Sequence, residues 1–339
     1  MLIIDILLML ETVVFKGLSA ISPYRKYFPA MIMLTMVLIM GLRVNVGVDY
    51  GAYAEIYDNK YSVNRYALEP FWIWLCDSMK FVGFKSRAFF MLTALVIIGG
   101  YYSGMKKMSP DIYLSIIIFI GCGLYYETSN TIRQCCAQAV LFAGTPRLLS
   151  GEWKKFSLFV ICAVILHVSA IVGTILLLLG RQTYKLWMVG GVLIVSFLGG
   201  SIVSRIIENN VMALMATSYT SESFSDGVSS GLLKYVYNLI GVIFLLLYPR
   251  LRKTNPRAVF FFNMTMIGIC IYNVFYSFMV MRRFTQYALP YITILLPMTE
   301  SLFRGRSRLL YICTIVFVLT IFTLKQVINT SYNFDIDFF

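Results

Sequence analysis

Charged residues are scarce in this chain: Asp, Glu, Lys and Arg together make up 13% of it, about half the share of a soluble globular protein. Histidine occurs once, at position 167, and the seven cysteines lie mostly inside apolar runs without the spacing of metal ligands. No cleavable signal peptide, internal repeat or low-complexity segment is visible. These absences exclude a soluble domain, a disulfide scaffold and a repeat protein, and we expect neither a metal nor another cofactor.

Apolar sequence is abundant instead, with 59% hydrophobic residues and a mean hydropathy of +0.77. Apolar runs of roughly 17 to 25 residues are long enough to cross a bilayer as helices. The sequence therefore predicts an all-α integral membrane protein, a polytopic bundle of about 11–12 transmembrane helices in a single domain over residues 1–339. The predicted spans are 2–15, 28–43, 88–104, 110–126, 131–149, 156–180, 186–204, 231–249, 258–281, 284–300 and 309–327.

The net charge of +13 indicates orientation rather than a nucleic-acid partner. A soluble chain of this charge could bind nucleic acid, but in a membrane protein the lysines and arginines of the loops set the topology. Basic clusters at 147–155, 250–257 and 304–308 mark cytoplasmic loops. The segments at about 43–87 and 205–231 mix acids with bases and are predicted to be loops on the outer side.

Two segments do not fit a simple alternation of spans. The segment 156–180 lies between two basic clusters that are both predicted to be cytoplasmic, so the chain must cross the membrane an even number of times between them. The number is even if 156–180 is a broken or re-entrant helix with its break near His167. The segment 68–84 mixes charged residues with two tryptophans. We expect it to form an amphipathic helix on the outer surface, because tryptophan suits the headgroup layer.

Four arginines, Arg43, Arg133, Arg282 and Arg283, lie at or inside the edges of apolar segments. A charge near hydrocarbon costs at least a few kcal/mol unless a partner or water meets it. Several such sites on one chain predict a shared anionic ligand, such as pyrophosphate. Arg282 and Arg283 also lie between two spans anchored inside, so they face the outer side against the usual charge bias.

Five short motifs follow one another along the chain. They read G-x-R-x-x-V-G-x-D-Y-x-x-Y from position 41, E-P from 69, N-x-I-R-Q from 130, H-x-S-A from 167, and a late R-x-x-x-Y that ends at Tyr287. In this order they resemble the EpsG-like branch of the Wzy-type polysaccharide polymerases, over residues 41–290. The departure is the pair Arg282 and Arg283, where the family usually has one arginine, and either of the two can correspond to it.

The resemblance implies a bacterial inner-membrane glycosyltransferase that polymerises O-antigen or another surface polysaccharide without a metal. The growing glycan would leave undecaprenyl pyrophosphate and pass to a sugar hydroxyl of a new lipid-linked repeat unit on the periplasmic side. Its partners would be these lipid-linked oligosaccharides and membrane lipid, and a chain-length regulator protein is a further candidate.

The resemblance also suggests roles for individual residues. Guanidinium groups bind pyrophosphate by bidentate hydrogen bonds, and the acceptor hydroxyl needs a general base. The predicted pyrophosphate ligands are Arg133 with one or both of Arg282 and Arg283, and Arg43, which either joins them or pairs with Asp49. The candidate bases are Asp49, Glu69 and His167, which the sequence does not separate. The candidate glycan contacts are Tyr50, Tyr53, Gln134 and Tyr287.

Each of these residues also has a structural interpretation. Arg43 can snorkel from the end of a span to the interface, and a single histidine in an apolar run is most often a packing group. Asp49 can be a turn residue, Glu69 before Pro70 can cap a helix, and tyrosines at a membrane surface usually belong to the aromatic belt.

Three other functions remain open from the sequence. An O-antigen ligase would use similar arginines and a histidine, but its motif order does not match the loop at 41–53. A membrane acyltransferase could use His167 as a base, although no acidic residue lies at helical spacing from it. A transporter or flippase of the lipid-linked oligosaccharide predicts internal symmetry between the two halves, which the sequence does not show.

Overall fold

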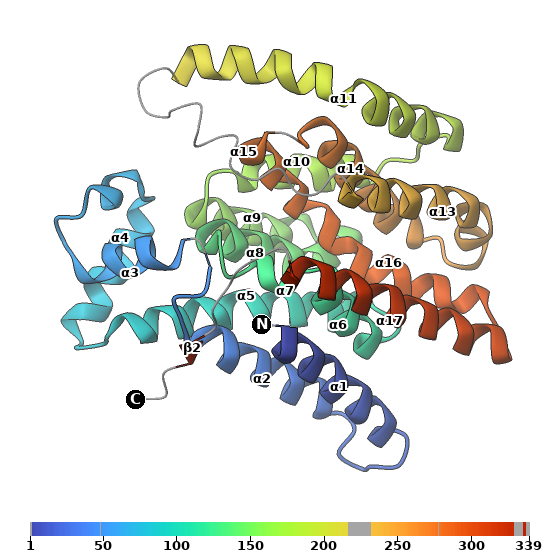
Figure 1. Cartoon of the computed structure of the whole chain (residues 1–339), viewed down its shortest axis with the longest axis horizontal. Helices are drawn as coiled ribbons and strands as arrows, with labels where there is room; N and C mark the ends of the chain where they lie inside the picture. The colour runs from blue at the N-terminus through green and yellow to red at the C-terminus, as the bar shows by residue number, and fades with distance from the viewer. Residues whose placement is uncertain (1, 48, 216–231, 277, 329–334, 337–339) are drawn as a thin grey trace. The chain divides into compact units, whose positions relative to one another are not determined.

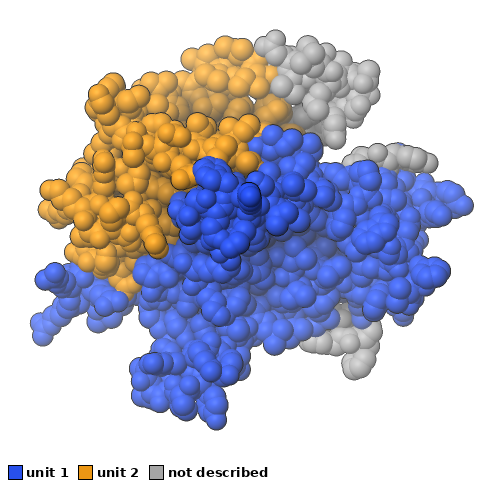
Figure 2. All heavy atoms as spheres, turned by 180° about the vertical axis from the view of Figure 1, so that it is seen from behind, with its two compact units in different colours: residues 1–171, 303–339 blue, residues 172–302 orange. Residues whose placement is uncertain are grey.

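The computed structural model describes residues 2–47, 49–215, 232–276, 278–328 and 335–336, and these are helical almost throughout (Figure 1). The described residues include one two-stranded sheet, in which β1 (Arg43–Val44) pairs antiparallel with β2 (Asp335–Ile336). The predicted helical class is therefore confirmed. The chain divides into two compact units: unit 1 comprises Met1–Ile171 and Phe303–Phe339, and unit 2 comprises Val172–Leu302 (Figure 2).

Helices α5 and α8 form the centre of unit 1, where α5 also packs on α2 and α8 on α9. Glycines allow the close approach of α5 and α8, because a Cβ at Gly100 would lie 2.7 Å from the carbonyl oxygen of Ala139 and one at Gly104 would meet the ring of Phe142. The helices of unit 1 are α1 (Leu2–Leu18), α2 (Phe28–Gly41), α3 (Tyr50–Asp58), η1 (Val63–Ala67), α4 (Pro70–Phe81), α5 (Ser86–Met108), α6 (Ile112–Gly121), α7 (Leu124–Glu127), α8 (Ile132–Leu149), α9 (Trp153–Leu166) and α17 (Gly305–Ile328).

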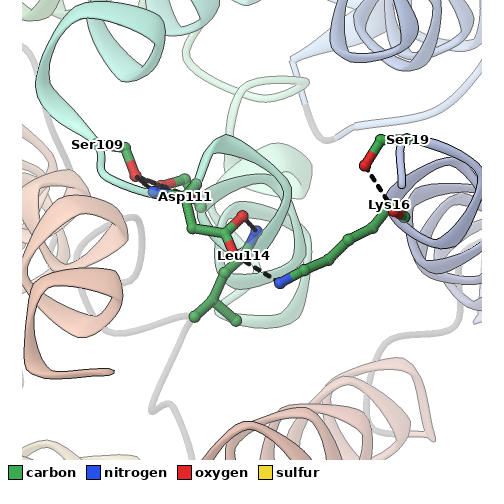
Figure 3. Close-up of polar contacts among 6 residues, drawn as sticks. Lys16, Ser19, Ser109, Asp111 and Leu114 are labelled. Carbon is green, nitrogen blue, oxygen red and sulfur yellow. Dashed lines mark hydrogen bonds and ion pairs between the residues drawn. The ribbon is translucent and has the colours of Figure 1, made fainter. Parts of the chain in front are cut away.

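Polar groups fasten the end of α1 to the start of α6 (Figure 3). Lys16 in the last turn of α1 forms an ion pair with Asp111, with 2.5 Å between Nζ and Oδ2. The other oxygen of Asp111 accepts a hydrogen bond of 3.1 Å from the backbone N–H of Leu114, so that Asp111 caps α6. Ser109 accepts from the N–H of Asp111 in turn. The boundary of α6 is therefore set by its cap.

Unit 2 is arranged around α14, which contacts α11, α13, α16, η2 and η3. Gly268 of α14 allows Leu289 to pack closely, because a Cβ at position 268 would lie 2.8 Å from the side chain of Leu289. The helices of unit 2 are α11 (Leu186–Met215), α13 (Leu232–Thr254), α14 (Ala258–Val274), α15 (Met279–Arg282), η2 (Arg283–Tyr287), η3 (Leu289–Tyr291), α16 (Ile292–Thr299) and η4 (Glu300–Leu302). Helix α10 (Ala170–Gly180) begins in unit 1 and ends in unit 2.

Two of the described helical segments, Ser86–Met108 and Leu186–Ile207, are long and apolar enough to cross a membrane. The four apolar helices of 10–17 residues among the described ones are Phe28–Gly41, Ile112–Gly121, Ala170–Gly180 and Ala258–Val274. The count of about 11–12 spans therefore stays a prediction, as does the single domain over residues 1–339.

Several predicted boundaries need correction. The predicted span 258–281 is broken after Val274, and the next, 284–300, consists of short helical pieces, with Pro290 near the start of one and Pro297 inside another. The predicted loop at 205–231 begins as helix, because α11 continues to Met215 through a sequence without glycine or proline after Gly200. Residues 216–231 of that loop lie outside the described part of the chain.

Both irregular segments contain the local structure that the sequence predicts, while their placement relative to a membrane stays a prediction. Helix α9 ends at Leu166 and α10 begins at Ala170, which confirms a break at His167. Whether the pair enters and returns on one side stays a prediction. The segment 68–84 contains α4, which buries Trp72 and exposes Trp74, and so has the two faces of an amphipathic helix.

The close packing of α5 on α8 predicts that Gly100→Ala destabilises the protein by about 1–3 kcal/mol, because the new methyl group would press on the backbone of α8. Gly99→Ala is the matched control on the same helix, since nothing lies within 4 Å of a Cβ at that position. It should be neutral or slightly stabilising, because alanine favours the helix. Thermal unfolding of the purified proteins in detergent measures both, and equal melting temperatures for the two variants would contradict this packing.

Candidate functional site

The carboxylate of Glu69 joins residues from three of the five motifs within unit 1. Its Oε1 lies 2.5 Å from Nδ1 of His167, and its Oε2 forms an ion pair with Nη1 of Arg133. Glu69 directly precedes α4, Arg133 is the second residue of α8, and His167 follows the last residue of α9. All three side chains are partly buried.

The local sequence explains why Glu69 points away from its own helix. Pro70 starts α4, and the residue before a proline is held in the extended conformation, as Glu69 is with φ −62° and ψ 142°. Its side chain makes no capping hydrogen bond to α4, so the interpretation as a helix cap is not supported. The carboxylate is directed instead to the two other helices.

Trp72 attaches α4 to the end of α9. Its side chain is 2% exposed, and its Nε1 donates a hydrogen bond of 2.7 Å to the carbonyl oxygen of Leu166, the last residue of α9. A carbonyl at a helix end has no partner within its own helix, so this bond satisfies it and fixes the position of His167 beside Glu69. Trp72 was not among the predicted site residues, because a tryptophan in an amphipathic helix is ordinarily assigned to the membrane surface.

The protonation of the cluster follows from the ionisation of Glu69. Burial alone would raise the pKa of Glu69, but hydrogen bonds from His167 and its own backbone, together with the charge of Arg133, lower this pKa to about 2. The carboxylate is therefore ionised at neutral pH and can only accept hydrogen bonds. Nδ1 of His167 must then be the donor, which leaves Nε2 as the position that can accept a proton. A carboxylate with so low a pKa is itself a weak base.

Tyr53 extends the cluster on the side of α3. Its hydroxyl accepts a hydrogen bond of 3.3 Å from Nε of Arg133, and burial raises the pKa of Tyr53, so the hydroxyl stays protonated. Tyr50, on the same helix, stacks on the ring of Phe90 with 4.5 Å between ring centroids. Both tyrosines were predicted to contact glycan, and for both this stays a prediction, as it does for the buried Gln134 beside Arg133.

Arg43 is 3% exposed and binds the main chain. Its guanidinium donates to the carbonyl oxygens of Met40, Val46 and Ser129 over 2.5, 3.3 and 3.4 Å, and lies 5.0 Å from the ring centroid of Phe90. This burial does not fit an arginine that snorkels to the interface. The described hydrogen bonds of Arg43 go to these carbonyls, and its alternative pairing with Asp49 stays a prediction.

The loop that follows Arg43 is held against the start of α8. Gly47 has a φ of +98°, and a Cβ at this position would lie 2.7 Å from the carbonyl oxygen of Ser129, so both the backbone conformation and the space require glycine. Asp49 ends the loop at the N-terminus of α3, partly buried and without a capping hydrogen bond to that helix. Its role as a general base stays a prediction.

The last motif lies in unit 2. Arg282 ends α15 and Arg283 begins η2, and Nη1 of Arg282 donates a hydrogen bond of 3.0 Å to the carbonyl oxygen of Tyr276. Tyr287 is buried and packs on Gly173 of α10, where a Cβ would lie 2.3 Å from its ring. The predicted contacts of these residues with pyrophosphate and glycan stay predictions. Among the described residues, no group of three or more His, Cys, Asp or Glu side chains could hold a metal ion.

The apolar helices, together with the family match that follows, indicate a helical membrane protein with a polar cluster at the break between two of its helices. The chain belongs to the EpsG family, whose model matches residues 26–336 and so includes all five motifs. The predicted resemblance is thereby confirmed. The family is associated with polysaccharide polymerase and glycosyltransferase activity, which supports a function of this general type. No curated protein and no solved structure matches the chain.

The bond between Trp72 and Leu166 predicts that Trp72→Phe lowers the free energy of unfolding by at least about 1–2 kcal/mol, because the carbonyl loses its donor and the phenyl ring fills less of the buried space than the indole. Trp74→Phe on the same helix is the control: its side chain is 62% exposed, and the change should stay within about 0.5 kcal/mol. Chemical unfolding followed by fluorescence tests the pair. Equal destabilisation of the two variants would contradict a particular role of Trp72 and its bond in holding α4.

Proposed function

We propose that this protein is a Wzy-type polymerase of O-antigen or a related surface polysaccharide in the bacterial inner membrane, with its active site on the periplasmic side. The observation that carries the proposal is the cluster of Glu69, Arg133 and His167, which joins three motifs of the EpsG family around one carboxylate. The proposed reaction transfers the growing glycan from undecaprenyl pyrophosphate to a hydroxyl of the terminal sugar on a new lipid-linked repeat unit.

His167 is the proposed general base. The acceptor hydroxyl oxygen attacks the anomeric carbon of the growing glycan, its proton passes to Nε2 of His167, and the bond to pyrophosphate breaks with its electron pair on the leaving oxygen. Glu69 holds Nδ1 and stabilises the imidazolium that forms, as carboxylates do in other histidine-based sites. The low pKa of Glu69 favours this orienting role over proton abstraction by Glu69 itself. Asp49 is the remaining candidate base.

Arg133 is the proposed ligand of the leaving pyrophosphate within unit 1. A guanidinium carries five N–H donors, and the contacts of Arg133 with Glu69 and Tyr53 orient its planar group. Because a preorganised cation stabilises the charge that develops on the leaving group, no metal is required in this proposal. We assign Arg282 and Arg283 to phosphate binding as well, whereas the burial of Arg43 supports a role in holding the loop of residues 43–47.

The function is tested by the surface glycan profile of a bacterium that lacks this gene, compared on a gel with the complemented strain. A polymerase predicts a single repeat unit on the lipid in the mutant and a restored ladder after complementation. Complete loss of glycan would indicate a ligase or a transporter instead, and an unchanged ladder would contradict a role in this pathway.

The same strain tests the site residues. Arg133→Ala and His167→Ala should each lower polymerisation by about 10²-fold or more, because one removes a leaving-group donor and the other the base. Arg147→Ala is the matched control, since Arg147 lies at the other end of α8 and also pairs with a glutamate, Glu152, over 2.7 Å. It should leave the ladder unchanged. A normal ladder from His167→Ala, with the protein inserted, would make His167 a packing residue and leave Asp49 as the base to test.

A further inference from the structure

Lys234 is a cation of unit 2 whose position is not explained by any carboxylate of the described residues. It lies near the start of α13 and is partly buried, and its Nζ donates a hydrogen bond of 3.0 Å to the carbonyl oxygen of Phe197 on α11. Among the described residues, no acidic side chain forms an ion pair with it. A lysine within an apolar helix bundle is costly without an anionic partner, and such residues commonly mark a ligand site.

Aromatic rings flank this ammonium group and connect it to a second cation. Nζ of Lys234 lies 4.8 Å from the ring centroid of Phe197 and 6.0 Å from that of Tyr276. The carbonyl oxygen of the same Tyr276 accepts the hydrogen bond from Arg282. Lys234 and Arg282 therefore contact one residue from two different elements, α13 and α15.

Helix α13, which carries Lys234, is joined to α11 and α14 by a polar network one turn further along. The side-chain amides of Asn238 and Asn273 bond to each other in both directions, over 2.6 and 2.9 Å, and Asn273 also donates to Ser196 of α11 over 3.1 Å. Gly200 lets α11 approach α14 closely, since a Cβ there would lie 2.5 Å from the carbonyl oxygen of Asn273. Lys234 therefore lies on a helix that is already joined to α11 and α14, which favours a preorganised site.

We infer that Lys234 and Arg282 form an anion-binding site around Tyr276 that takes phosphate groups of the lipid-linked glycan. The inference rests on the proposed function for the identity of the lipid, and on the geometry of unit 2 for the site. The two cations suit a pyrophosphate, because arginine binds phosphate oxygens in a fork while lysine acts as a point charge. The adjoining rings of Tyr276 and Tyr272, with 6.1 Å between centroids, offer an aromatic surface to a sugar.

The direct test is binding of geranylgeranyl pyrophosphate to the purified full chain in detergent. Lys234→Met should weaken binding about 10-fold or more, because a charge-assisted contact is lost, and Lys234→Arg should stay within about 3-fold of the parent. Lys80→Met is the matched control: Lys80 also donates to a backbone carbonyl, that of Asp58 over 2.9 Å, and lies 5.4 Å from the ring centroid of a tyrosine. It should bind the probe as the parent does.

Equal affinities of the Lys234→Met and Lys80→Met variants would overturn the inference, because Lys234 would then be a structural cation. If Lys234→Met does not insert in the membrane, Lys234→Gln serves in its place. The glycan ladder separates this inference from the proposed function. Loss of the ladder in Arg133→Ala with unchanged probe binding in Lys234→Met would leave the polymerase and remove this site. An unchanged ladder in the strain that lacks the gene, with weakened probe binding in Lys234→Met, would leave this site and remove the polymerase.

Discussion

The carboxylate of Glu69 is the group on which the candidate site depends, because each of its oxygens meets a residue of a different helix. It fixes the tautomer of His167 and the plane of Arg133 together. Removing it would leave a partly buried guanidinium without its carboxylate and an imidazole without its orienting partner, so the two would lose their relative position. The start of α4 at Pro70 and the bond from Trp72 to the end of α9 hold that carboxylate in place.

Two arginines of unit 1 show how the same side chain serves different ends. Arg43 donates its hydrogen bonds to main-chain carbonyls, so it stabilises the backbone of the loop. Arg133 bonds to the side chains of Glu69 and Tyr53, which can reorient when a ligand arrives. This difference is the reason to place the leaving group at Arg133.

Much of the helical fold could be predicted from apolar runs, and the break at His167 from the parity of the charged loops. The motifs indicated the family, and Glu69, Arg133 and His167 were among the predicted site residues. Their contact could not be predicted, because Glu69 is 64 and 98 residues from its two partners and no local pattern records a tertiary bond. The burial of Arg43 depends on neighbours from other segments. Lys234 stands at the edge of the predicted span 231–249, and its contacts with Phe197 and Tyr276 come from distant segments that the sequence does not connect to it.

The reciprocal bonds between Asn238 and Asn273 have a consequence for how this protein can change over evolution. Each amide is both donor and acceptor to the other, so replacing one asparagine alone leaves the amide oxygen of the other without its donor between packed helices, at a penalty of about 1–3 kcal/mol. Replacing both by apolar residues of similar size removes that penalty. Positions 238 and 273 should therefore vary together among related chains. In related chains that lack both asparagines, we expect apolar packing alone to hold α13 against α14.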